Sequence, residues 1–342
     1  MNEQKPLQNN YRKKQRKAVL KLVALLLVAA TLFATSAWSW FRSADNQKAT
    51  ANGLQLGTLD EGLEMSIKVN GEYSTFSRGI DILSYANGEL LKDLDMIPLT
   101  GLGYKVSSTN KVHLYNPVFT YKADGTAVPL QTATDWTEGV ANRDYISLEV
   151  KFRSVDPVVI YLGSGTEVVM RSEKNGQPSN ISEYGDFSRD AIVGALRMSV
   201  CDANENLKFI WIPRPDVRLT KYDDGTYSLN SGIEIKDYWA GVHAYYAADA
   251  NKTSLSRTGC AQASGAFTAT ADGGTSLTDK TLVGEANKQK EKMLVGDEYK
   301  EYYVCSAIFR IWVDGCDEEA VRALSRGEFN LKLNFVAIIK EG

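Results

Sequence analysis

Apolar and polar residues alternate over most of the chain after Leu54, a pattern typical of strands with one buried and one wet face. The first such stretch runs from Leu63 to Val69, where every second residue is apolar. The clearest one runs from Tyr145 to Arg153, just before Asp156-Pro157. The spacing therefore predicts β-strands over both stretches.

The last 40 residues carry the most regular pattern. Apolar residues occupy both faces from Tyr303 to Val313, which predicts a central strand that is covered on both sides. A closing strand is expected from Phe329 to Phe335, where apolar residues again alternate. Between the two, Asp317 suits the N-cap of a short helix and Gly327 lies just past its expected end.

Two further strand pairs are expected in the middle of the chain. Residues 158–170 are predicted to form a hairpin that turns at Gly163-Ser164-Gly165. The apolar runs 191–200 and 207–212 are separated by a short polar segment, which favours an antiparallel pair.

Composition changes at residues 248–297, which are rich in Ala, Gly, Ser, Thr and Lys and hold few large apolar side chains. Such a segment cannot bury enough surface for a core of its own, so we expect a long surface insertion. The many short strands predict an all-β protein, a β-sandwich of jelly-roll type with one short C-terminal helix. The sandwich domain is expected to span residues 40–342, after an N-terminal hydrophobic helix.

Residues 1–39 have the three parts of a signal peptide: a basic region to Lys21, an apolar region from Leu22 to Phe33, and small residues before Trp40. Signal peptidase, the first expected partner, requires small side chains just before the bond it cuts. The predicted cleavage region comprises Ala37, Trp38, Ser39 and Trp40.

An uncleaved membrane anchor is the alternative, because Leu22 to Phe41 is a run of 20 uncharged residues. A run of roughly 20 apolar residues is long enough to cross a bilayer. The preceding lysines and arginines favour a cytoplasmic N-terminus in both cases. We therefore expect a secreted or cell-surface protein whose contact with the membrane is confined to residues 18–41.

Charge argues against nucleic acid as a partner. The chain carries a formal net charge of −3, but its first 39 residues hold seven basic residues and one acidic residue, so the remainder has a net charge of −9. A domain this acidic is repelled by phosphate backbones.

The N-terminal region also resembles a known family. The apolar run ends in Ala37-Trp38-Ser39-Trp40-Phe41, and a polar segment then leads to the sequence Gly-Leu-Gln-Leu-Gly-Thr-Leu-Asp at residues 53–60. This order resembles the start of the TasA and camelysin group, exported proteins of Gram-positive bacteria that are often processed by a dedicated signal peptidase. The resemblance covers about 40 residues and implies a divergent member.

The resemblance raises the question of a zinc site, because members of the camelysin group are classed as metallopeptidases. The chain has two histidines, His113 and His243, and no H-E-x-x-H motif. A catalytic zinc usually takes at least two histidines with a carboxylate, or histidine with cysteine. One structural histidine on each of two strands is therefore the preferred interpretation, and we expect no cofactor.

The four cysteines are evenly numbered but have no metal-ligand spacing. The sequence is compatible both with disulfides and with buried free thiols, and it leaves any pairing undetermined. The residues concerned are Cys201, Cys260, Cys305 and Cys316.

Other polar and aromatic groups favour structural roles. The carboxylate pairs Asp93/Asp95 and Asp223/Asp224 lie outside any calcium-loop motif and are expected in solvated turns. Exposed aromatics could stack on sugar rings, but apolar neighbours predict core packing instead. The aromatic residues considered are Trp211, Trp239, Trp312, Tyr245, Tyr246, Tyr302 and Tyr303.

The sequence therefore favours a non-enzymatic structural protein of the cell surface or biofilm matrix that assembles with itself or with similar proteins. The expected assembly element is the strand-like segment after the export signal, because a terminal strand can join the sheet of a neighbouring copy. Its defining residues are Gly53, Leu54, Leu56 and Leu59. The alternatives are a secreted metalloendopeptidase of camelysin type and a carbohydrate- or protein-binding adhesin.

Overall fold

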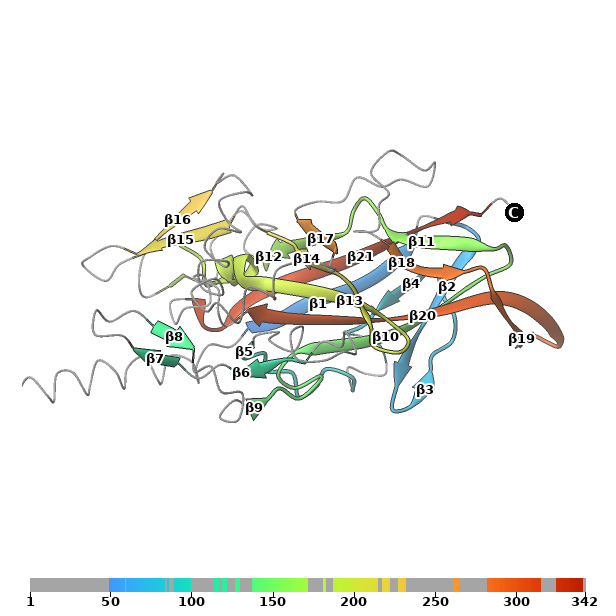
Figure 1. Ribbon diagram of the computed structural model, residues 1–342, viewed down its shortest axis with the longest axis horizontal. Helices are drawn as coiled ribbons and strands as arrows, with labels where there is room; N and C mark the ends of the chain where they lie inside the picture. The colour runs from blue at the N-terminus through green and yellow to red at the C-terminus, as the bar shows by residue number, and fades with distance from the viewer. Residues whose placement is uncertain are drawn as a thin grey trace, which may run out of the picture. The chain divides into compact units, whose positions relative to one another are not determined.

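The computed structural model describes residues 49–58, 60–83, 85, 89–99, 113–116, 119–121, 127–129, 137–171, 181–182, 187–214, 217–221, 227–231, 261–264, 282–314 and 324–340. In these residues β-strands predominate and form two large sheets and three small ribbons (Figure 1). The prediction of an all-β protein is confirmed. The expected signal peptide or anchor, residues 1–39, lies outside the described residues.

Sheet A has six strands and is built around β21, the last strand of the chain. β1 runs parallel to β21 on one side, and β11 and β12 run antiparallel to it on the other (Figure 1). In spatial order the strands are β18 (Leu282–Ala286), β11 (Val158–Leu162), β21 (Gly327–Ile339), β1 (Ala49–Thr58) and β4 (Gly79–Asp81), with β12 (Glu167–Met170) also paired to β21.

Sheet B has nine strands and is built around β20, which pairs with β10 on one side and with β13 and β19 on the other. In spatial order the strands are β17 (Ala261–Ser264), β14 (Leu207–Ile212), β13 (Leu196–Asp202), β20 (Glu298–Asp314), β10 (Ile146–Ser154), β2 (Leu63–Val69) and β3 (Glu72–Tyr73), with β19 (Gln289–Val295) and β5 (Pro98–Leu99) also paired to β20.

The smaller elements lie between these strands in the chain. A 3₁₀ helix, η5 (Arg189–Ala195), begins after Ser188, whose hydroxyl accepts a hydrogen bond from the Asp190 amide at 3.2 Å. The ribbons are β15 (Val217–Lys221) with β16 (Tyr227–Ser231), β6 (Tyr115–Asn116) with β9 (Thr137–Glu138), and β7 (Phe119–Tyr121) with β8 (Ala127–Pro129).

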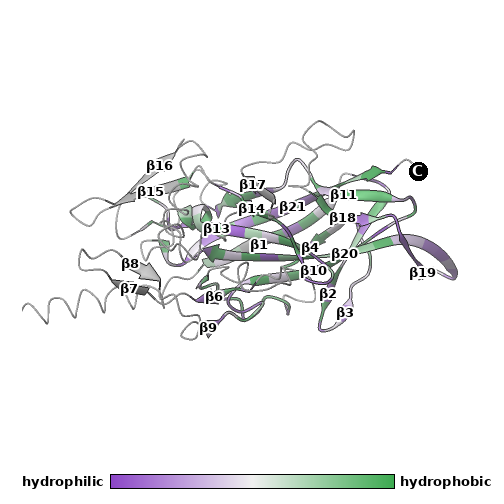
Figure 2. Cartoon of the chain, in the orientation of Figure 1, coloured by the Kyte–Doolittle hydropathy of each residue, from purple (hydrophilic) through white to green (hydrophobic). Residues whose placement is uncertain are grey.

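The two large sheets share one hydrophobic core. Phe335 of sheet A lies edge-on between two aromatic residues of sheet B, with ring centroids 4.9 Å from Phe152 and 5.6 Å from Phe309. Fully burying a side chain of this size stabilises the fold by about 1.5–3 kcal/mol relative to leaving it exposed. The inward-facing apolar residues of both sheets follow the alternation in the sequence, and hydrophobic and hydrophilic segments alternate along several of the paired strands (Figure 2).

Several strand predictions are confirmed. β2 spans Leu63–Val69 as expected, and β10 and β21 match the stretches predicted from alternation. β20 is central in its sheet and covered on both faces, because Phe309 faces the main core whereas Trp312 packs into a second cluster with Leu99. β13 and β14 form the expected antiparallel pair, although residues 189–195 are 3₁₀ helix rather than strand.

The predicted hairpin over residues 158–170 is wrong. β11 and β12 do not pair with each other; both pair with β21 on the same side, β11 with residues 335–339 and β12 with residues 329–332. They form one interrupted strand, and Gly163-Ser164-Gly165 belongs to the loop that interrupts it. The same glycine-rich sequence suits a hairpin turn or an interruption within one strand. Here it is an interruption, because the residues on both sides of it pair with β21.

The expected surface insertion is too long at its C-terminal end. β17, β18 and β19 all fall within residues 248–297; β18 joins sheet A, whereas β17 and β19 join sheet B. β19 forms a largely exposed ribbon with the start of β20, and its polar sequence suits this exposure (Figure 2). The helix expected from Asp317 lies outside the described residues. In the part of the chain that the structure describes, no helix is long and apolar enough to cross a membrane.

Candidate functional site

The expected assembly strand is β1, and the structure places three of its four defining residues. Gly53, Leu54 and Leu56 lie within β1, whereas Leu59 is outside the described residues. Leu54 and Leu56 are 0% and 2% exposed because they point between the two sheets into the shared core. The strand is therefore an interior part of its own sheet and not an exposed edge.

Backbone hydrogen bonds hold β1 on both sides. On one side it pairs in parallel register with β21, from Ala49 opposite Gly327 to Thr58 opposite Phe335. On the other side β4 covers residues 55–57, and the Ile82 amide donates to the Leu54 carbonyl at 2.8 Å. We call the space that β1 fills between β21 and residues 78–82 the slot.

Two side chains tie the C-terminal end of β1 to β21. The Thr58 hydroxyl donates to the Phe335 carbonyl at 3.2 Å and accepts from the Asp60 amide at 3.0 Å. Asp60 Oδ2 in turn accepts a hydrogen bond from the Ala337 amide at 3.0 Å, which extends the contact with β21 past the end of β1. The chain then reaches β2 of sheet B at Leu63, so a short link joins the two sheets.

The outward face of β1 carries glycines at two positions beside β21. Gly53 lies opposite Asn330 and Gly57 lies opposite Asn334 in the register. A Cβ atom at residue 53 would lie 2.6 Å from Asn330 Oδ1, and one at residue 57 would lie 3.0 Å from Asn334 Oδ1. Sequence reasoning missed both asparagines, although they share with the two glycines a spacing of four residues.

Asn334 is held by the loop between β11 and β12. Its Nδ2 donates to the Ser164 carbonyl at 3.0 Å, and its backbone amide donates to the Thr166 hydroxyl at 2.9 Å. The Thr166 hydroxyl donates back to the Asn334 carbonyl at 3.1 Å. Gly165 has a φ of +80°, and a Cβ there would lie 2.4 Å from Asn334 Nδ2. The loop therefore fixes the side chain that faces Gly57.

The two described cysteines are free thiols. Cys201 is buried in β13, and Cys305 of β20 lies against Gly284 of the opposite sheet. Burial raises the pKa of the Cys201 thiol to about 11 and that of the Cys305 thiol to about 12. A nucleophilic cysteine needs a lowered pKa, so neither residue suits catalysis. Cys260 and Cys316 lie outside the described residues, as does the cleavage region Ala37, Trp38, Ser39 and Trp40.

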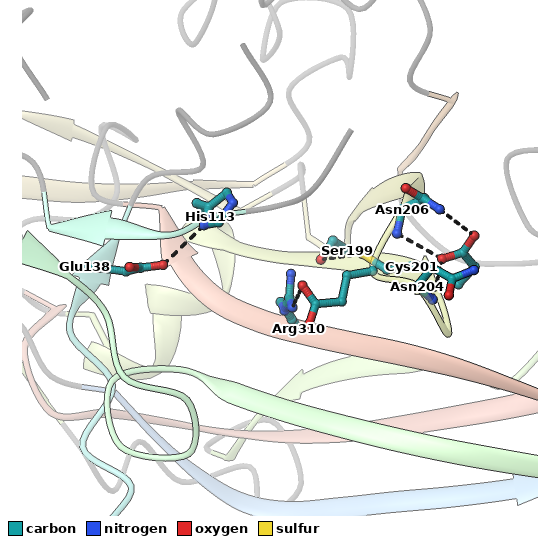
Figure 3. A network of polar contacts seen from close by, with 9 residues as sticks. His113, Glu138, Ser199, Cys201, Asn204, Asn206 and Arg310 are labelled. Atoms are coloured by element: carbon teal, nitrogen blue, oxygen red, sulfur yellow. Dashed lines mark hydrogen bonds and ion pairs between the residues drawn. The ribbon is translucent and has the colours of Figure 1, made fainter. Parts of the chain in front are cut away.

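Polar groups next to β6 and β9, and others around β13 and β20, also have structural partners (Figure 3). His113 Nδ1 lies 3.2 Å from Glu138 Oε1, with stacked contact to Tyr115 on its own segment. His243 lies outside the described residues. Arg310 Nη2 lies 3.5 Å from Glu205 Oε2, and the Cys201 thiol lies 4.0 Å from the Ser199 hydroxyl.

A metal site and a sugar-binding aromatic surface are the alternatives to structural roles for these residues. Among the described residues, no group of three or more His, Cys, Asp or Glu side chains could hold a metal ion. Trp211 and Trp312 are buried in the core, as predicted, and Tyr302 is nearly so. Asp223, Asp224, Trp239, Tyr245 and Tyr246 lie outside the described residues.

Comparisons with protein-family models, with curated proteins and with solved structures find no match to this chain. The geometry of β1 and its slot therefore carries the functional argument.

Proposed function

We propose that this chain is an exported structural protein of the cell surface or biofilm matrix that assembles by exchanging β1 between copies. The observation that carries the proposal is that β1, the first strand after the expected export segment, fills an interior slot with buried leucines. The same strand fits the same slot in a second copy. This differs from the predicted addition to an open sheet edge, because β1 is interior to sheet A.

Exchange preserves the contacts of β1, because each contact within one copy is replaced by the identical contact with another copy. A copy that receives β1 from a neighbour regains the parallel ladder with β21 and the burial of Leu54 and Leu56. We propose that each copy donates β1 to one neighbour and receives β1 from a different one. This contact is heterologous and extends into a fibre if the rotation does not close. The proposal has two further parts. The strands of the sandwich are connected as in a jelly roll, and cleavage of the signal peptide frees β1 for exchange.

The test is the oligomeric state of the purified exported protein across a wide concentration range. We expect large assemblies by sedimentation and filaments by electron microscopy, and their growth should require the complete β1. A protein that stays monomeric at every concentration, with no filaments, contradicts the proposal.

A further inference from the structure

The outer face of the slot is closed by two asparagine side chains. Asn330 and Asn334 lie on the outward face of β21, four residues apart, and each faces a glycine of β1. The contact distances of 2.6 Å and 3.0 Å to a Cβ at residues 53 and 57 leave no room for an ordinary side chain unless an asparagine moves. Gln55, between the two glycines, is exposed and free of this restriction.

The two asparagines differ in how easily they can move. Asn334 is 6% exposed, and its side chain is fixed by the bond to the Ser164 carbonyl. Asn330 is only half-buried, and the atom nearest to residue 53 is the end of its side chain. The restriction at residue 57 is therefore the stricter one, despite its longer distance.

The matching sequence occurs once in the chain. Glycines four residues apart are found at Gly53 and Gly57 and at no other place among the 342 residues. Leucines at residues 54 and 56 add the inward requirement, because both are buried in the shared core. Other strands of this protein carry side chains at one or both of the glycine positions.

We infer that Asn330 and Asn334 make the slot selective for a strand of the pattern Gly-Leu-x-Leu-Gly, and that the intended second occupant is β1 of another copy of this chain. The inference rests on the proposed strand exchange and names what restricts it. The asparagine carboxamides exclude strands with side chains at the glycine positions, while the backbone of β21 and the core pockets hold the strand that fits.

The restriction can be measured first within one chain, whether or not strands exchange. We expect Gly57→Ala to lower the denaturant midpoint of the full-length protein, and Asn334→Ala to lower it as well. Because Asn334→Ala removes the obstructing atom, the double variant should be more stable than the sum of the two losses predicts. Gln55→Ala, on the same outward face, is the matched control and should leave the midpoint unchanged. Strictly additive losses for Gly57 and Asn334 would overturn the selective role.

The second measurement uses a fluorescent peptide of residues 47–60 added to the full-length protein, with bound peptide read from anisotropy. The native and Gln55→Val peptides should enter the slot equally well, and the Gly57→Val peptide at least tenfold more weakly. Asn334→Ala in the protein should recover binding of the Gly57→Val peptide. Equal binding of the native and Gly57→Val peptides contradicts the selectivity. Exclusion of the native peptide, with the coupling within one chain intact, instead overturns strand exchange and with it the second copy as occupant.

Discussion

The two edges of β21 are filled by neighbours of different character. On one edge, β11 and β12 form an antiparallel strand that is interrupted by a loop, and the loop holds Asn334 through bonds to Ser164 and Thr166. On the other edge, β1 pairs in parallel and meets the asparagines with glycines. Side chains bond both neighbours to β21, Thr166 on the first edge and Thr58 and Asp60 on the second, but only β1 places glycines opposite the asparagines. Under the proposed exchange, β11 and β12 are the permanent neighbours of β21 and β1 is the exchangeable one.

The largest effect is expected at the inward face of β1. Leu56→Ala should lower the free energy of unfolding by about 2–5 kcal/mol, because it opens a cavity between the sheets. Urea denaturation measures the loss. Gln55→Ala is the control on the same strand and should change the free energy of unfolding by less than about 0.5 kcal/mol. Similar losses for the two variants would show that β1 is not part of the core.

The edge of β21 that pairs with β11 and β12 can be weakened at Gly165. Gly165→Ala should cost about 1–3 kcal/mol, because it places a side chain at a positive φ and against Asn334 Nδ2. Gly62→Ala is the matched control, since a Cβ there meets nothing within 4 Å and φ lies outside the positive region. Thermal unfolding compares them, and an unchanged midpoint for Gly165→Ala would contradict the account of the loop.

The stability losses of two threonine variants, one at each edge of β21, compare the edges directly. Thr166 is buried and both accepts from and donates to Asn334, so Thr166→Val should cost about 1–3 kcal/mol by leaving the Asn334 amide unpaired. Thr58 is half-buried and donates to the Phe335 carbonyl, so Thr58→Val should cost about 0.5–1.5 kcal/mol. Chemical denaturation of both variants gives the order. A greater loss at Thr58 would reverse the assignment of the permanent edge.

The smallest effect is a pH dependence that leaves both edges of β21 untouched. The thiols of Cys201 and Cys305 have an ordinary pKa near 8.5 when unfolded, and burial raises it to about 11 and about 12 when folded. The folded state therefore retains protons that the unfolded state loses, so stability should fall as the pH rises above about 8.5 toward these values. The double variant Cys201→Ala/Cys305→Ala should show a shallower decline by denaturation at stepped pH. An identical slope would contradict the assignment of these thiols.

Local patterns predict the strands but not the partners that define the slot. Alternation suffices for β2 and β10, because one face of each strand is buried. It does not show that Gly163-Ser164-Gly165 interrupts a strand, since this depends on Asn334, which is 170 residues from Ser164 along the chain. β19 was missed because Lys290 and Lys292 resemble loop composition, although Lys290 lies over the ring of its cross-strand partner Tyr303.

The candidate site shows the same division. The apolar pattern around Leu54 and Leu56 predicts a strand, and the structure confirms that segment as β1. Its interior position could not be predicted, because the parallel pairing with β21 joins the two ends of the described chain. The roles of Asn330 and Asn334 depend on the same long-range register.

Strand exchange is tested most directly by cross-linking between copies that each carry one half of a cysteine pair. Gln55 and Lys332 are exposed register partners on β1 and β21, so Gln55→Cys in one copy and Lys332→Cys in another can meet only if β1 changes copies. Cα atoms of neighbouring strands lie within the range that a disulfide spans. Oxidation of the mixed, assembled protein should give a covalent dimer whose linked peptides contain residues 55 and 332. A mixture without this linkage, while the double variant on one chain forms it internally, would show that β1 stays in its own molecule.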